Sequence, residues 1–132
     1  MKFSTENVGT WFYFNEDKEE DGGLCLRILS LAETTALDAK YKKTRIEYKR
    51  NNRFEVPVID EQGYDQAMWD MVITDWLNVC DADGTPLECN KANKFELMSR
   101  SVAFASFVTE KTEALAKISA VDSEDSVKNS LT

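Results

Sequence analysis

The chain has 132 residues and a formal net charge of −8, with a sequence pI of about 4.6. Hydrophobic residues make up 42% and charged residues 30% of it, which is the composition of an ordinary globular protein of one domain. The negative charge argues against a nucleic-acid-binding protein, because a phosphate backbone repels such a surface, and it favours a basic partner instead.

The composition also argues against catalysis. The chain has no histidine, which removes the commonest general base near neutral pH and the commonest metal ligand, and excludes histidine-dependent triads. We therefore predict no enzyme, no catalytic residue, no cofactor and no metal. The three cysteines, Cys25, Cys80 and Cys89, are an odd number without metal-like spacing and indicate reduced thiols of a cytosolic protein. Cys80 and Cys89 flank a turn and could pair if oxidised.

No targeting segment is expected from the sequence. The N-terminus has a single lysine and no apolar core region of the kind that a signal peptide needs. No apolar run approaches the roughly 20 residues that span a bilayer. We therefore expect a cytoplasmic protein with no membrane partner.

The first part of the chain predicts an antiparallel β-hairpin followed by a helix. Residues 10–14 are dense in aromatic side chains, and residues 24–29 place Leu24, Leu26 and Ile28 on one face, with the charged turn 15–23 between the two runs. Ser30 and Glu33 have the spacing of a capping box, so a short helix is expected to begin there.

The first predicted strand contains four consecutive aromatic residues, Trp11, Phe12, Tyr13 and Phe14. Successive strand residues point to opposite faces, so this strand cannot bury all four on one side. It is either covered on both faces or half exposed as a contact patch. The sequence leaves both alternatives open.

Residues 40–53 contain seven of the 16 basic residues and begin a second predicted hairpin. Ile46 and Tyr48 alternate with charged residues, and Asn51-Asn52 suits a tight turn before the next alternating run. The favoured interpretation is a two-stranded ribbon with one solvated face. The alternatives are a contact with the acidic face of a neighbouring subunit and, less favoured because of the overall charge, binding of single-stranded nucleic acid.

Charge is divided between regions of the chain. The stretch Glu16–Asp21 and the C-terminal tail are acidic, whereas residues 40–53 are basic. Opposite patches on one molecule suit head-to-tail association. We therefore expect self-association and no nucleic-acid partner.

The core is expected from the apolar stretch that begins at Tyr64. Its side chains form two neighbouring stripes at helical spacing, together wider than the apolar face of an ordinary amphipathic helix. A helix of this kind, continuing through Trp76, is buried on most sides by its own domain or by another subunit. We predict that five residues of this helix form the core: Met68, Trp69, Val72, Ile73 and Trp76.

Turn and helix signals follow this stretch. Residues 81–86 indicate a turn, and although they begin like a calcium loop, they lack the further ligand spacing of an EF-hand. Asn90 is suited to cap a helix over Lys91–Arg100, and a last helix is expected from Val102 to about Ile118.

These elements predict an α+β fold with an N-terminal β-hairpin, a short helix, a second β-hairpin and then a C-terminal bundle of about three helices. Residues 1–118 form a single globular domain in this interpretation. Residues 119–132 are small, polar and acidic, and are expected to form a disordered tail.

Residues 73–108 carry a resemblance to a known family. A hydrophobic residue and Trp76 close a helix, a D-x-D-G-x-P turn follows at Asp81–Pro86, an N-K-x-x-L-M segment spans Asn93–Met98, and an F-A-x-F-V helix begins at Phe104. In these motifs, and in earlier W-F-x-F and lysine-rich I-E-Y runs, the chain resembles the tail assembly chaperones of long-tailed (siphovirus-type) bacteriophages and prophages. The resemblance covers about two-thirds of the chain.

The resemblance implies a non-enzymatic late protein of virion morphogenesis in the host bacterial cytoplasm. Such chaperones coat the long, helical, aggregation-prone tape-measure protein, recruit the major tail tube protein and leave before the virion is complete. Many are extended by a programmed frameshift, for which the polar tail of this chain is a suitable place. An acidic domain with surplus apolar surface agrees with binding of an apolar helical client.

We expect contacts with client or subunits on exposed aromatic residues of the first strand and on the last helix: Trp11, Phe12, Tyr13, Phe14, Phe104 and Phe107. The alternative function is a structural component of the virion, such as a neck or tail-completion protein. A structural component would remain in purified particles, whereas a chaperone would be absent from them.

Overall fold

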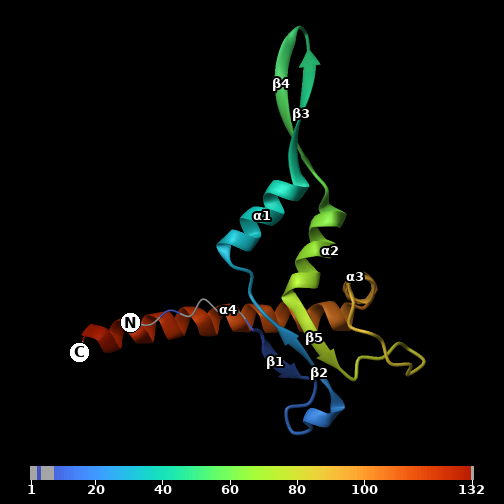
Figure 1. Ribbon diagram of the computed structural model, residues 1–132, viewed down its shortest axis with the longest axis vertical. Coiled ribbons are helices and arrows are strands. Elements are labelled where there is room, and N and C mark those ends of the chain that lie inside the picture. Colours follow the sequence, from blue (N-terminus) through green and yellow to red (C-terminus); the bar gives the residue numbers. More distant parts are fainter. Residues whose placement is uncertain (1–2, 4–7, 132) are drawn as a thin grey trace.

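The computed structural model describes residue 3 and residues 8–131, with side chains up to residue 118. The predicted α+β fold is confirmed, with strands and one helix first, a second strand pair next and helices at the end. Figure 1 shows three parts: a body made of a small sheet and helices, a two-stranded arm that extends away from it, and a long C-terminal helix that crosses the body.

A three-stranded antiparallel sheet lies at the centre of the body. β1 (Thr10–Tyr13) pairs with β2 (Gly23–Leu26), which pairs on its other edge with β5 (Ile73–Leu77). All four residues of β2 are buried, because this strand has a neighbour on each edge and its two leucines face the core cluster. The loop before β2 contains the short 3-10 helix η1 (Glu19–Asp21) and ends at Gly22, whose φ of 105° suits only glycine.

The helix that the sequence predicts through Trp76 ends earlier. α2 (Glu61–Val72) is capped at its start by the Asp60 side chain, and Ile73 already belongs to β5. Three consecutive β-branched residues begin at Val72, and such residues lose side-chain freedom in a helix. Strand pairing with β2 therefore overrides the helical spacing of the sequence.

α1 (Leu31–Tyr41) begins at the predicted capping box. Ser30 Oγ accepts a hydrogen bond from the Glu33 N–H, and the Glu33 carboxylate accepts one from the Ser30 N–H, both at 3.2 Å. The Arg27 guanidinium also donates two hydrogen bonds to Glu33, at 2.7 and 2.8 Å. The Arg27 bonds are the largest cause that lowers the pKa of Glu33 to about 2, and they tie the end of β2 to the start of α1.

The second hairpin forms the arm, which consists of β3 (Lys42–Lys49) and β4 (Asn52–Ile59) in antiparallel register. Arg50 and Asn51 make its two-residue turn, with φ of 54° and 65°. The turn thus lies one residue before the predicted Asn51-Asn52, and its two consecutive positive φ angles are those of a two-residue hairpin turn. α1 leads into β3 and α2 follows β4, so two helices hold the base of the arm (Figure 1).

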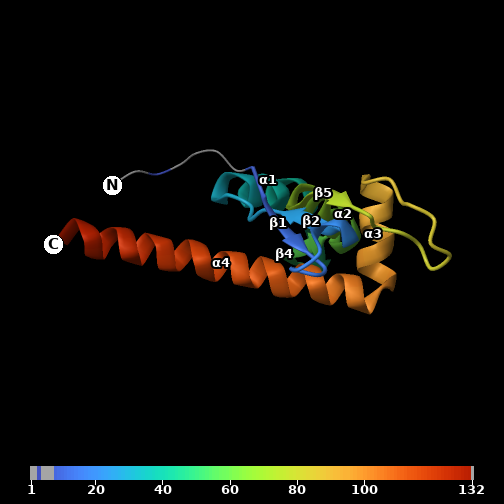
Figure 2. The same ribbon diagram turned by 90° about the horizontal axis from the view of Figure 1, so that it is seen from below.

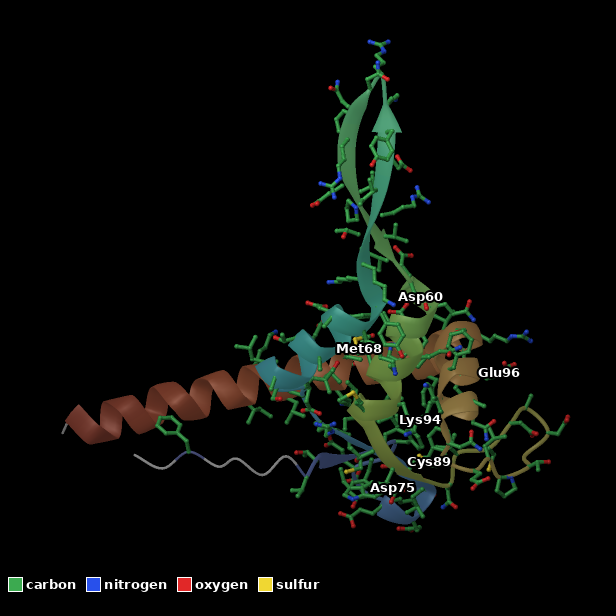
Figure 3. All side chains as sticks on the ribbon, turned by 45° about the horizontal axis from the view of Figure 1, so that its top comes forward. Asp60, Met68, Asp75, Cys89, Lys94 and Glu96 are labelled. Carbon is green, nitrogen blue, oxygen red and sulfur yellow. The ribbon has the colours of Figure 1, made fainter. Side chains whose placement is uncertain are left out.

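α3 (Lys91–Arg100) packs against α2. Asn90 caps it as predicted, with its side chain accepting a hydrogen bond from the Asn93 N–H at 2.8 Å. Lys94 is buried and lies beside α2 (Figure 3), where its Nζ donates to the Asp70 carboxylate at 3.0 Å and to the Asp70 main-chain carbonyl at 3.1 Å. A cation at the C-terminal end of a helix is favourable, so Lys94 fixes α3 against the last turn of α2.

α4 (Val102–Leu131) runs under the body and extends past it (Figure 2). Its backbone continues beyond Ile118, where the sequence predicts the end of this helix, so that predicted end is wrong. The side chains of residues 119–132 lie outside the described part of the chain. The division into a domain of residues 1–118 and a tail of residues 119–132 stays a prediction.

The core lies between the sheet, the segment after β5 and α4. Phe12, Leu97, Phe104 and Phe107 are partly buried and pack against it. The fully enclosed part of the core is small and draws on four segments of the chain, with the buried residues Leu24, Leu26, Ile73, Trp76, Val79 and Val108.

Candidate protein-binding surfaces

α4 forms one wall of two open grooves on the surface of the body. The first, called here the α2–α4 groove, has a volume of about 470 Å³ and lies between the segment after β2, α2 and the middle of α4. It is mainly apolar, and its apolar lining includes Ile28, Met68, Trp69, Val72, Met98 and Val108.

The lining of the α2–α4 groove combines adaptable apolar side chains with a few polar ones. Met68 and Met98 are unbranched and polarizable, so they adjust to apolar surfaces of different shape. Trp69 is held in place by stacking on Phe95, at 5.9 Å between ring centroids. Two threonines and Glu113 of α4 add polar groups to the lining. The groove therefore suits an apolar segment that carries polar groups at its sides.

The second groove, called here the phenylalanine groove, has a volume of about 530 Å³ and lies where β1, the segment after β5, α3 and α4 meet. It brings together Phe14, Phe104 and Phe107, three of the residues that the sequence predicts as contacts. Phe14 and Phe107 make an edge contact at 5.1 Å, and Phe14 is 45% exposed. Val79 and Leu97 complete its apolar lining.

The remaining predicted contact residues are divided between the surface and the core. Trp11 is exposed and stacks on Tyr13, at 6.1 Å between ring centroids, so both lie on one side of β1. Phe12 points to the opposite side and packs against the core cluster. Phe104 makes an edge contact with Trp76 at 6.1 Å and is half-buried. The first strand is therefore half exposed, which was one of the two alternatives open from the sequence.

The predicted core residues also fall into two groups. Ile73 and Trp76 are buried in the core cluster, and the Trp76 indole N–H donates to the Leu87 carbonyl at 2.9 Å. Val72 packs against the cluster from outside. Met68 and Trp69 are half-buried and line the α2–α4 groove.

In the acidic turn after β5, the Asp81 carboxylate accepts hydrogen bonds from main-chain groups of the turn itself. Asp81 Oδ1 accepts hydrogen bonds from the Asp83 N–H at 2.9 Å and from the Thr85 N–H at 3.0 Å. Within the residues that the structure describes, no group of three or more histidine, cysteine, aspartate or glutamate side chains is arranged to hold a metal ion. Burial is the largest cause that raises the pKa of Cys89, which disfavours its thiolate.

Sequence reasoning missed the wall that α4 contributes to the α2–α4 groove. Val108, Thr112 and Ala116 recur every four residues and therefore lie on one face of the helix. The spacing was visible in the sequence, but the polar threonine and small alanine do not register as an apolar stripe. Ile28 and Met98 could not have been linked to this wall, because they are brought there only by the sheet and by the packing of α3.

The chain matches the family model described as "YdaY prophage protein" over residues 32–129, which covers more than half of it. The match extends from α1 into the last part of α4, and it confirms the expected phage or prophage origin. Comparisons with curated proteins and with solved structures gave no match. Among the described residues, no helix is long and apolar enough to cross a membrane. The chain belongs to the YdaY prophage protein family.

Proposed function

We propose that this prophage protein is a non-enzymatic tail assembly chaperone that binds the tape-measure protein in the cytoplasm of the host bacterium. In this role it keeps the client soluble and assists assembly of the tail tube, where the major tail tube protein is a further partner. The observation that carries the proposal is the α2–α4 groove, an open apolar surface with two methionines in its lining.

A groove of this composition suits the face of an apolar helix. Helix-in-groove recognition buries one stripe of the client and leaves its polar face in water. Flexible methionine side chains let one groove accept many different stripes, which a chaperone needs along a long client. The net charge of −8 adds solubility to a complex with an aggregation-prone partner.

The first experiment is co-expression with the tape-measure protein of the same prophage, followed by size-exclusion chromatography with light scattering. The expected result is a soluble complex with several copies of this chain on each client. An insoluble client beside free chaperone would contradict the proposal.

A groove variant tests the site. Ala116 is exposed and lines the groove, so Ala116→Glu places a charge there without disturbing the core. We expect client affinity to fall at least about tenfold, because a buried unpaired polar group costs roughly 1–3 kcal/mol and a charged one costs more. Ala92→Glu, on the exposed side of α3, is the matched control and should bind the client normally. Equal binding by both variants would exclude the groove as the client site.

The alternative function is a neck or tail-completion protein of the virion. The half-exposed phenylalanine groove is a surface that a permanent structural contact could cover. Quantitative mass spectrometry of purified particles separates the two functions. Stoichiometric amounts of this chain in the particle would favour the structural component, and its absence would favour the chaperone.

A further inference from the structure

The arm exposes apolar side chains that nothing within the described part of the chain covers. Of the residues in β3 and β4, only Val56 is half-buried, and the rest are exposed. Ile46, Tyr48 and Phe54 are 48%, 75% and 47% exposed. The register places Ile46 and Tyr48 on one face of the ribbon and Phe54 and Val56 on the other. An isolated two-stranded ribbon is only marginally stable in water, so this arm is a surface that gains from being covered.

The arm also has a large excess of positive charge. Residues 42–59 contain six basic and two acidic residues, in a chain whose net charge is −8. The two acidic residues are paired within the arm, Glu47 with Arg45 and Glu55 with Arg53. Lys49 and Arg50, at the tip of the arm, take part in none of the ion pairs found among the described residues.

The opposite end of the molecule has the complementary surface. Residues 15–22, between β1 and β2, contain five acidic residues and one lysine, and Figure 1 shows this loop at the far end of the body from the arm. The loop is fixed in place, since the Asn78 side chain donates to the Glu20 carbonyl at 2.6 Å. Phe14 and Leu77, each 45% exposed, lie beside it. We name these residues together the acidic end.

We propose that the arm of one copy of this chain docks on the acidic end of a second copy. Both surfaces combine exposed apolar side chains with charge, and the charges are of opposite sign. One molecule cannot make this contact with itself, because the two surfaces lie at opposite ends (Figure 1). The contact is heterologous, so repeated docking produces an open chain of copies or a closed ring.

The charge distribution also argues against two other binding partners of the arm, namely the arm of a second copy and a nucleic acid. Arm-to-arm pairing of two copies would bring their excess positive charges together, which is unfavourable. A nucleic acid would meet the basic tip but would be repelled by the rest of the chain, which carries the whole negative excess. A second copy presents the acidic loop and apolar residues on one rigid surface.

The test uses the chain alone, without client, in sedimentation velocity over a concentration series. At an ionic strength of about 0.05 M we expect reversible association, and at about 0.5 M a large loss of it, because salt screens the attraction. The double variant Lys49→Gln with Arg50→Gly should associate more weakly, with an apparent dissociation constant about tenfold higher. Glycine accepts the positive φ of residue 50, so the variant retains the turn.

Two further variants identify the contact. Lys91→Gln with Lys117→Gln, at exposed positions outside the arm, causes the same change of net charge and should associate like the parent. Lys49→Glu with Arg50→Glu should abolish association, and adding Glu19→Lys with Glu20→Lys in the same chain should restore it. Rescue of this kind requires the two surfaces to meet directly.

Three results would overturn the inference. The first is a parent chain that stays monomeric at low salt, and the second is a charge exchange that fails to rescue association. The third is binding of a single-stranded oligonucleotide that the tip variant loses while its oligomeric state is unchanged. The groove variant Ala116→Glu leaves arm and acidic end intact, so loss of client binding and loss of self-association are separable.

Discussion

The body sheet and the arm are both built from antiparallel strands, yet they place their apolar side chains in opposite environments. Leu24, Leu26 and Ile73 of the body sheet are fully buried, whereas almost every residue of the arm is exposed. The difference does not come from the strands themselves. It comes from the helices and the third strand that cover β2, which the arm lacks. The same local pattern therefore supports stability in one region and leaves surface for binding in the other.

The largest expected effect comes from one substitution made in both regions. Ile73→Ala should lower the free energy of unfolding by about 3 kcal/mol, because it removes fully buried methyl groups and leaves a cavity. Ile46→Ala should change it by less than about 0.5 kcal/mol, since Ile46 is half exposed. Urea unfolding monitored by tryptophan fluorescence measures both values. Similar losses for the two variants would mean that the arm is covered in the free monomer.

The next largest effect on stability is expected from removing a buried lysine, compared with removing an exposed lysine of the arm. Lys94→Ala should cost about 2 kcal/mol, because it removes a buried side chain and its pair with Asp70, although the half-exposed Asp70 carboxylate is solvated afterwards. Lys43→Ala in the arm should lie within about 0.5 kcal/mol of the parent. The same urea experiment gives both numbers. An unchanged midpoint for Lys94→Ala would show that the α2–α3 contact does not depend on this pair.

A smaller effect on stability is expected from the ion pairs, and it differs between the Arg27–Glu33 pair of the body and the Arg45–Glu47 pair of the arm. Arg27 lowers the pKa of Glu33 to about 2 in the folded state, below its ordinary value of 4.5. Glu33 therefore stabilises the fold above pH 4.5, and this contribution is lost as the pH falls from there toward 2. Glu33→Gln should lower the melting temperature at neutral pH and reduce its fall on acidification. Glu47→Gln, at the exposed pair with Arg45, should leave the melting temperature at neutral pH almost unchanged.

Much of the fold followed from local sequence signals. The capping box at Ser30 and Glu33, the cap at Asn90 and the two hairpins were predicted because each depends on residues close together in the chain. The end of α2 was predicted wrongly, because the edge of β2 that draws Ile73 into a strand lies almost fifty residues away. Hydrophobic spacing at positions 68–76 fits a helix, and only tertiary pairing decides otherwise.

The candidate surfaces were harder to predict than the fold. Phe14, Phe104 and Phe107 were expected as contacts, and the structure brings them into one groove. The α2–α4 groove was not expected, since its lining comes from the segment after β2 and from all four α-helices, and it includes small and polar residues of α4. The local sequence was therefore enough to predict aromatic residues that line a surface. It was not enough to predict a groove, because a groove forms only when distant elements pack together.

The smallest expected effect lies at the turn of the arm. Arg50 adopts a φ of 54°, a left-handed conformation that costs a non-glycine residue about 1 kcal/mol. Substitution by glycine removes this cost, but part of the gain is offset because glycine is more flexible in the unfolded chain. Arg50→Gly should therefore stabilise the closed arm by a few tenths of a kcal/mol. Amide hydrogen exchange at high salt, where self-association is screened, should become slightly slower in β3 and β4 and stay unchanged in β2. Faster exchange in the arm would mean that contacts of the Arg50 side chain, rather than the turn geometry, hold the strands together.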